Sequence, residues 1–142
     1  MRPAYHDRVV FTRYVAPAAP SGAWVDYFAR WPFALVPPDD PLYDLTLDPG
    51  GHPVVTEERF GKWGPALATA TDGASELVLA GVSTDCCVLS TALAAADAGL
   101  HVRVVADACA GASTEDHRRA LDAMALYAPL IEVTTVADVL AG

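Results

Sequence analysis

The strongest constraint on the fold is an alternation of short apolar segments and helical segments in the C-terminal half of the chain. Runs rich in β-branched residues predict strands at 77–81, 102–107 and 131–135. Helical patterns lie between them at 86–98 and 114–127. Connections of this length join parallel strands, so the pattern predicts an open, mostly parallel α/β sheet. In such sheets ligands bind beyond the carboxyl ends of the strands.

The N-terminal half is less regular. It predicts two further strands at 8–15 and 53–56, and Pro-rich segments at 16–20 and 37–41 enclose an aromatic stretch. Core or lid packing is the usual role of such aromatic residues, and a wall facing a substrate is the alternative.

Length and charge limit the classes of function. A chain of 142 residues forms one domain with a single core, and no apolar run is long enough to span a membrane. A net charge of −9 argues against a nucleic-acid partner and favours a small-molecule substrate. The first residues lack a signal peptide, so we expect a cytoplasmic protein. The odd number of cysteines and the scattered histidines predict reduced thiols and neither a metal nor another cofactor.

The most informative segment is 77–92, L-V-L-A-G-V-S-T-D-C-C-V-L-S-T-A. It places Cys86 and Cys87 at the N-terminus of a predicted helix, where the helix dipole favours a nucleophilic thiolate and backbone N–H groups can stabilise an oxyanion. Free cysteines are also often buried as small apolar residues, so the spacing alone leaves both interpretations open.

Residues 81–92, G-V-S-T-D-C-C-V-L-S-T-A, resemble the nucleophile motif G-V-x-T-D-x-C-V-x-x-T-A of the isochorismatase-like cysteine hydrolases. The resemblance implies a three-layer α/β fold with helices on both faces of the sheet, over a single domain at 1–142. It also implies that Cys87 is the nucleophile, that Ser83 and Cys87 form the oxyanion hole, and that the peptide bond between Val82 and Ser83 is cis. The implied reaction is hydrolysis of the C–N amide bond of a small molecule through a thioester.

The resemblance extends to the aromatic stretch at 24–32 and to 57–63. In these segments it implies four aromatic residues that bind substrate: Trp24, Tyr27, Phe60 and Trp63.

The chain departs from the family at its N-terminus, since the family's first strand, which ends in a catalytic Asp, and the helix after it have no counterpart. Asp7 precedes the strand at 8–15, about 20 Å from the carboxyl edge, and cannot replace that Asp. Because the absent strand is central in the family, we expect unpaired backbone and an apolar groove between 8–15 and 77–81. We also expect a true start upstream of Met1, in preference to a miniature fold, and self-association of the chain.

The second departure concerns the family's catalytic lysine. Aligning K-x-x-[YF]-[SG]-x-F with 57–63 puts Glu57 at the amine's position. Lys62, the only lysine, could reach back towards the thiol, but the favoured interpretation of residues 57–62 is a solvated loop that contains an ion pair. His117 is expected to be a structural or capping residue and not a partner of Cys87.

Two functional hypotheses follow. The first is a cysteine-dependent amide hydrolase that uses Cys87, with Glu57 at the lysine position. The alternative is a catalytically impaired or truncated homologue that acts as a small-molecule-binding or structural remnant. Hydrolysis of a vinyl ether, as in isochorismatase itself, needs no cysteine, so the intact T-D-x-C-V motif argues against it.

Overall fold

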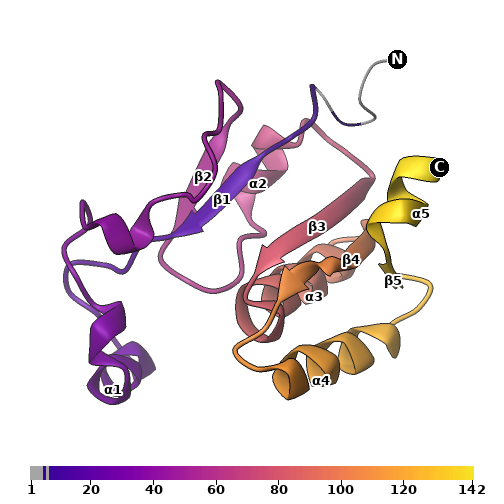
Figure 1. Ribbon diagram of the computed structural model, residues 1–142. Coiled ribbons are helices and arrows are strands. Elements are labelled where there is room, and N and C mark those ends of the chain that lie inside the picture. Colours follow the sequence, from indigo (N-terminus) through magenta and orange to yellow (C-terminus); the bar gives the residue numbers. More distant parts are fainter. Residues whose placement is uncertain (1–4, 6) are drawn as a thin grey trace.

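The computed structural model describes residue 5 and residues 7–142. Figure 1 shows the elements in chain order. The strands are β1 (Phe11–Tyr14), β2 (Val54–Glu57), β3 (Glu76–Val82), β4 (His101–Ala110) and β5 (Ile131–Thr134). The helices are α1 (Ala23–Arg30), η1 (Pro32–Ala34), η2 (Pro41–Tyr43), α2 (Pro65–Ala70), η3 (Thr84–Val88), α3 (Leu89–Asp97), α4 (Thr114–Ala125) and α5 (Val136–Ala141).

The predicted α/β architecture with parallel strands is confirmed. All five predicted strands are present, and β4 extends beyond its expected end. The strands form two parallel groups, β1–β2 and β3–β4–β5. The sheet is therefore divided between β1 and β3.

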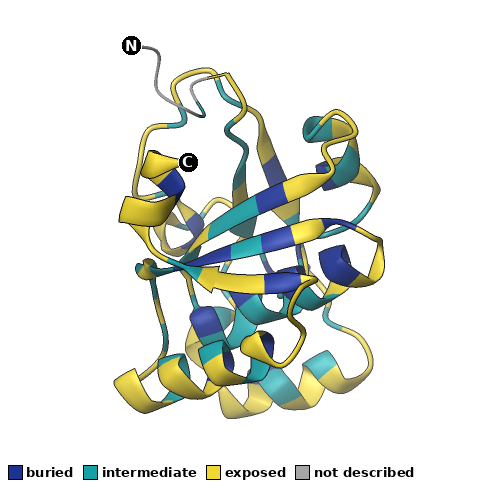
Figure 2. Ribbon diagram, turned by 90° about the vertical axis from the view of Figure 1, so that its right-hand side faces the viewer, coloured by how far each residue is buried: buried dark blue, intermediate teal, exposed yellow. Residues whose placement is uncertain are grey.

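The main core lies around β4, both faces of which are covered. The consecutive residues Val104 and Val105 point to opposite faces, yet they are only 0% and 3% exposed. Val104 packs in the main core with Ala92 of α3 and Met124 of α4. Figure 2 shows the C-terminal helix α5 on the other side of the three strands from α3 and α4. The three-layer arrangement follows from this packing.

Local signals placed the helix ends well in two cases. The Ser113 side chain accepts a hydrogen bond from the backbone N–H of Asp116 at 3.0 Å, which caps α4. After α3, Gly99 adopts φ +95°, a left-handed conformation that favours glycine.

The predicted start of the helix at residue 86 is wrong. A π-helical turn, η3, comes first because Val88 donates its N–H to the carbonyl of Ser83, five residues back, and α3 begins at Leu89. The sequence reasoning also did not predict α1, α2 or α5.

The aromatic stretch forms a small core of its own. Ala16, Phe28 of α1 and Tyr43 are buried together, and the Tyr43 hydroxyl donates to the carbonyl of Ala34 at 2.7 Å. Figure 1 shows α1 beyond the carboxyl end of β1, away from the three-stranded group. The packing role is therefore confirmed for part of this stretch.

A groove of about 750 Å³ occupies the division in the sheet. Val10 and Thr12 line it on the β1 side, and residues 76–80 with Val82 line it on the β3 side. Val82 is 71% exposed although it continues a strongly apolar strand. The predicted groove between these strands is thus present.

None of the helices in the described part of the chain is long and apolar enough to cross a bilayer.

Candidate active site

The candidate nucleophile lies where β3 gives way to η3, at the carboxyl edge of the sheet. The Val82–Ser83 peptide bond is cis, as the resemblance implied. The Ser83 carbonyl accepts hydrogen bonds from the N–H groups of Cys86 and Val88, each at 3.1 Å. These bonds fix the turn that carries Cys87. The half-buried Cys87 also lines one end of the groove between β1 and β3.

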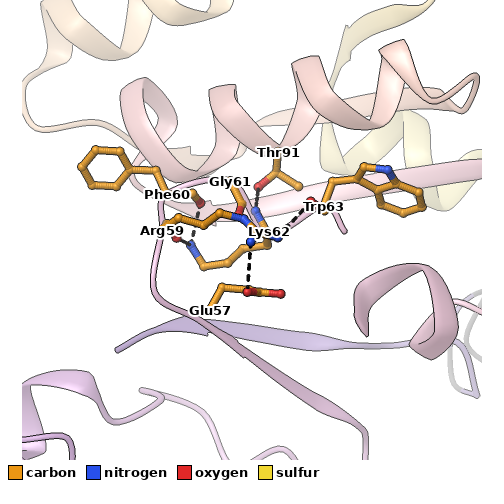
Figure 3. A network of polar contacts seen from close by, with 7 residues as sticks. All are labelled: Glu57, Arg59, Phe60, Gly61, Lys62, Trp63 and Thr91. Carbon is orange, nitrogen blue, oxygen red and sulfur yellow. Dashed lines mark hydrogen bonds and ion pairs between the residues drawn. The ribbon is translucent and has the colours of Figure 1, made fainter. Parts of the chain in front are cut away.

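Lys62 is the cation beside this thiol. Its side chain is within hydrogen-bonding reach of Cys87. The Nζ atom donates to the carbonyls of Arg59 at 2.9 Å and Phe60 at 2.6 Å, and the residue is only 3% exposed. Figure 3 shows the lysine side chain turned back under its own loop. The predicted solvated loop is therefore wrong for Lys62, because this turn buries the amine and gives it carbonyl partners.

Burial and the neighbouring negative charges act in opposite directions on the pKa of Lys62. Desolvation lowers the pKa of Lys62, and the Cys87 sulfur, through its charge and a hydrogen bond, partly offsets that effect. The carboxylate of Glu57 offsets it further. A lysine with a lowered pKa beside a thiol can exchange a proton with it.

Thr91 of α3 connects two segments of the site. One is the loop of residues 59–63 that carries Lys62 (the lysine loop), and the other is the turn of residues 83–88 that carries Cys87 (the nucleophile turn). The Thr91 hydroxyl accepts a hydrogen bond from the backbone N–H of Lys62 at 2.9 Å and donates to the carbonyl of Cys87 at 2.7 Å. Thr91 is buried, so these bonds are shielded from water. Figure 3 shows the hydroxyl above the loop. One side chain thereby sets the position of both reactive residues.

Glu57 lies at the end of β2, close enough to Lys62 for its charge to act on the amine. Its ion pair is with Arg59, at 3.5 Å between the guanidinium Nη1 and the carboxylate Oε2. An ion pair expected within residues 57–62 is therefore present, and it joins Glu57 to Arg59. The chain reverses after Glu57, which brings Arg59 next to it.

A polar cluster supports the other side of the turn. The Ser83 hydroxyl donates to the Asp85 carboxylate, which also accepts the N–H of Ala112 at 3.0 Å. The Ser83 bond, more than the Ala112 bond, lowers the pKa of Asp85. Beside it, Thr84 Oγ1 and His117 Nδ1 are 2.7 Å apart and join η3 to α4. This contact agrees with the structural role expected for His117.

Aromatic rings cluster around Phe60, and two tyrosines of this cluster, Tyr14 and Tyr27, lie close enough to Cys87 for their charges to interact. Phe60 lies with its ring centroid 5.1 Å from that of Trp24 and 5.5 Å from that of Tyr27. Burial, followed by the charges of Cys86 and Cys87, raises the pKa of Tyr27. Burial also raises the pKa of Tyr14, to about 12, and the charges of Tyr43, Tyr27 and Cys87 add to this effect in that order. Both phenols therefore stay neutral at physiological pH.

Trp63 does not join this group. It packs against the main core, and Figure 3 shows its ring on the opposite side of the loop from Phe60. Of the four aromatic residues expected to bind substrate, Trp24, Tyr27 and Phe60 therefore lie together, and Trp63 lies apart from them. Tyr14, which the sequence reasoning did not single out, lies with its ring centroid 6.3 Å from that of Phe60.

Over the described residues, no group of three or more His, Cys, Asp or Glu side chains is arranged to hold a metal ion.

We expect iodoacetamide to alkylate Cys87 before Cys86 and Cys109. Burial, reinforced by Asp85, raises the pKa of Cys86, and burial also raises that of Cys109, so both thiols are largely protonated near pH 8. Cys87 has Lys62 beside it to stabilise a thiolate. Peptide mapping by mass spectrometry after limited labelling gives the order, and earlier labelling of Cys86 or Cys109 would contradict the assignment.

Comparison with known proteins agrees with this geometry. The model of the isochorismatase domain matches residues 4–138. A mouse protein, isochorismatase domain-containing protein 2A, is 44% identical over 63 residues, which is 42% of this chain and 31% of that protein. The chain therefore matches only about a third of the length of this curated relative.

Two solved structures have the same fold. A cysteine hydrolase from Pseudomonas syringae pv. phaseolicola superposes with a TM-score of 0.82 at 19% identity, over 97% of this chain and 72% of that one. An isochorismatase-like hydrolase from Alkaliphilus metalliredigens gives a TM-score of 0.70 at 19% identity, over 93% of this chain and 71% of that one. Since the domain model also covers nearly all of the sequence, the chain belongs to the isochorismatase family.

Proposed function

We propose that this protein is a cysteine hydrolase that cleaves the C–N amide bond of a small molecule through a thioester on Cys87. The observation that carries the proposal is the contact between Cys87 and Lys62 at the carboxyl edge of β3. Family membership makes hydrolysis the expected class of reaction. The cysteine hydrolase with the same fold supports thiol chemistry.

In the proposed first step, the Cys87 thiol passes its proton to the Lys62 amine, which burial makes less basic than an exposed lysine. The thiolate sulfur attacks the carbonyl carbon of the amide. The developing oxyanion would be stabilised by backbone N–H groups at Ser83 and Cys87. The C–N bond then breaks, and the leaving nitrogen takes the proton held by Lys62.

In the second step, water attacks the thioester carbonyl, and the Lys62 amine accepts the proton of that water. The carbon–sulfur bond breaks, the acid leaves, and Cys87 recovers its proton. Trp24, Tyr27 and Phe60 would contact the substrate next to the thiol. Glu57 would act on the amine, since its negative charge favours the protonated form of Lys62.

The alternative is a binding protein that has lost turnover, and Glu57 at the position of the family's catalytic lysine favours it. Transfer of an acyl group to Cys87, followed by its release, distinguishes the hydrolase from the binding protein. We expect 4-nitrophenyl acetate to place one acetyl group on Cys87 and then release acetate with turnover. Replacement of Cys87 by Ser should abolish the acetylated species, whereas Cys86→Ser, the matched control, should retain it.

Intact mass spectrometry detects the acetylated chain, and released acetate measures turnover. A panel of small amides, followed by the release of ammonia, then tests the proposed bond specificity. A chain that is acetylated but turns over neither the ester nor any amide is a remnant. A chain in which Cys87→Ser and the unsubstituted protein behave alike does not use this thiol.

A further inference from the structure

We propose that Cys87 and Lys62 form a reversible oxidation site, in which a hydroperoxide links their side chains by a bond between Sγ and Nζ. The product is a sulfenamide, which thiols reduce back to the free cysteine and lysine. The inference concerns the thiol of the proposed hydrolase and rests on the same contact with Lys62, but it does not require turnover.

The amine of Lys62 has one position left for the sulfur. Besides its bond to carbon, an amine nitrogen has three tetrahedral positions for hydrogens or a lone pair. Two of them are occupied, because Nζ donates to the carbonyls of Arg59 at 2.9 Å and Phe60 at 2.6 Å. The Cys87 side chain, within hydrogen-bonding reach, takes the third. In the neutral amine both hydrogens bind the carbonyls, and the lone pair is directed at the sulfur.

The surroundings of the amine favour its neutral form. Lys62 is only 3% exposed, and desolvation lowers its pKa. The neutral form is the one that can attack sulfur, because the lone pair forms the new bond. Figure 3 shows the side chain folded back beneath its loop, which keeps the amine beside the site and out of the solvent.

The bonds of Thr91 keep the two reactive side chains together. Its hydroxyl joins the N–H of Lys62 to the carbonyl of Cys87, so the lysine loop and the nucleophile turn separate only if these bonds break. Two groups held in contact react as if each were present at a very high concentration. We therefore expect the amine to reach an oxidised sulfur before a second molecule of peroxide does.

Cys86 is poorly placed to take the part of the amine. Consecutive Cα atoms are about 3.8 Å apart, less than the roughly 4.4 to 6.8 Å usual for a disulfide. The Cys86 sulfur lies 3.8 Å from the Asp85 carboxylate, to which it donates. Burial, followed by the charge of Asp85, raises the pKa of Cys86 and keeps its thiol protonated. A disulfide between the two adjacent cysteines is therefore disfavoured.

The chemistry has two balanced steps. The Cys87 thiolate attacks the hydroperoxide, the oxygen–oxygen bond breaks, and a sulfenic acid and one molecule of water or alcohol form. The lone pair of Nζ then attacks the sulfur, the sulfur–oxygen bond breaks, and the hydroxide leaves as water with one proton of the amine. In the reverse direction, two thiol molecules are oxidised to their disulfide, and the free thiol and amine return.

The test uses hydrogen peroxide and the chain with Cys86→Ser and Cys109→Ala. We expect its mass to fall by about 2 Da, because the new bond removes two hydrogens. Cleavage after glutamate places Lys62 in the peptide 59–76 and Cys87 in the peptide 77–115. These two peptides should be linked after oxidation, and dithiothreitol should release them.

Lys62→Met in the same background is the matched control. Its sulfenic acid has no amine beside it, so dimedone, which traps sulfenic acids, should label Cys87. The chain that keeps Lys62 should take up at least about tenfold less dimedone. Longer exposure to peroxide should convert Cys87 of the control to the irreversible sulfinic acid.

Equal dimedone labelling of the two chains would overturn the proposal, as would sulfinic acid without linked peptides in the chain that keeps Lys62. A chain that does not react with peroxide would also overturn it. The linked peptides are sought in a chain with its lysine intact, so the result does not depend on the folding of Lys62→Met. Turnover of 4-nitrophenyl acetate without linked peptides would contradict only the oxidation site, and linked peptides without turnover would contradict only the hydrolase.

Discussion

Replacement of Lys62 by Met should slow alkylation of Cys87 by iodoacetamide at neutral pH about tenfold. The side chain of Lys62 lies within hydrogen-bonding reach of the sulfur, and its removal takes away the cation that favours the reactive thiolate. Turnover of any substrate of Cys87 should fall further, by about 10² to 10⁴, if Lys62 also moves the proton. Because Lys62 is buried, Met can occupy its space and preserve the fold.

A second substitution in the same background makes this test specific. Glu57→Lys puts an amine at the end of β2, from which the charge of residue 57 already acts on the site. We expect the double variant Lys62→Met with Glu57→Lys to recover part of the alkylation rate. The rate is measured against pH in chains that also lack Cys86 and Cys109. An unchanged rate in Lys62→Met would exclude Lys62 as the cation that stabilises the thiolate.

Replacement of Gly111 by Ala should lower the free energy of unfolding by about 1 to 3 kcal/mol. A Cβ atom at this position would lie 2.8 Å from the backbone nitrogen and 2.9 Å from the Cα of His117. Those are backbone atoms at the start of α4 and cannot rotate away. The helix must shift, which disturbs the contact between Thr84 and His117 that supports the nucleophile turn.

Thermal unfolding followed by circular dichroism measures this effect, with an expected decrease in Tm of about 3 to 10 °C. Gly61→Ala is the matched control, because its Cβ would lie 3.5 Å from the Cβ of Ser90, an ordinary contact. We expect the control to melt within about 2 °C of the unsubstituted chain. Equal Tm values for the two variants would show that α4 can move without cost.

The order of the strands along the chain and the position of the nucleophile could be predicted, because both depend on local sequence patterns. The apolar runs determine β3, β4 and β5, and the helical segments between them require parallel connections. The same pattern places Cys87 immediately after β3, at the edge where ligands bind. The resemblance added the division of the sheet, which the groove between β1 and β3 reflects.

The start of α3 shows the limit of such local reasoning. A helical pattern from residue 86 does not distinguish an α-helical from a π-helical first turn. The bond from Val88 to the Ser83 carbonyl makes that distinction. This bond depends on the direction in which the chain leaves β3. The spacing of apolar residues in the sequence does not determine that direction.

The sequence by itself thus determined the α/β elements, the position of Cys87 after β3 and the presence of a single amine. Only the tertiary structure decided that Lys62 meets the thiol while Glu57 pairs with Arg59, and that Phe60 and Trp63 face opposite sides. The physical reason is the range of the interactions involved. Elements follow from neighbours along the chain, whereas Lys62 reaches Cys87 because buried Thr91, 29 residues further on, bonds to the Lys62 amide and to the Cys87 carbonyl.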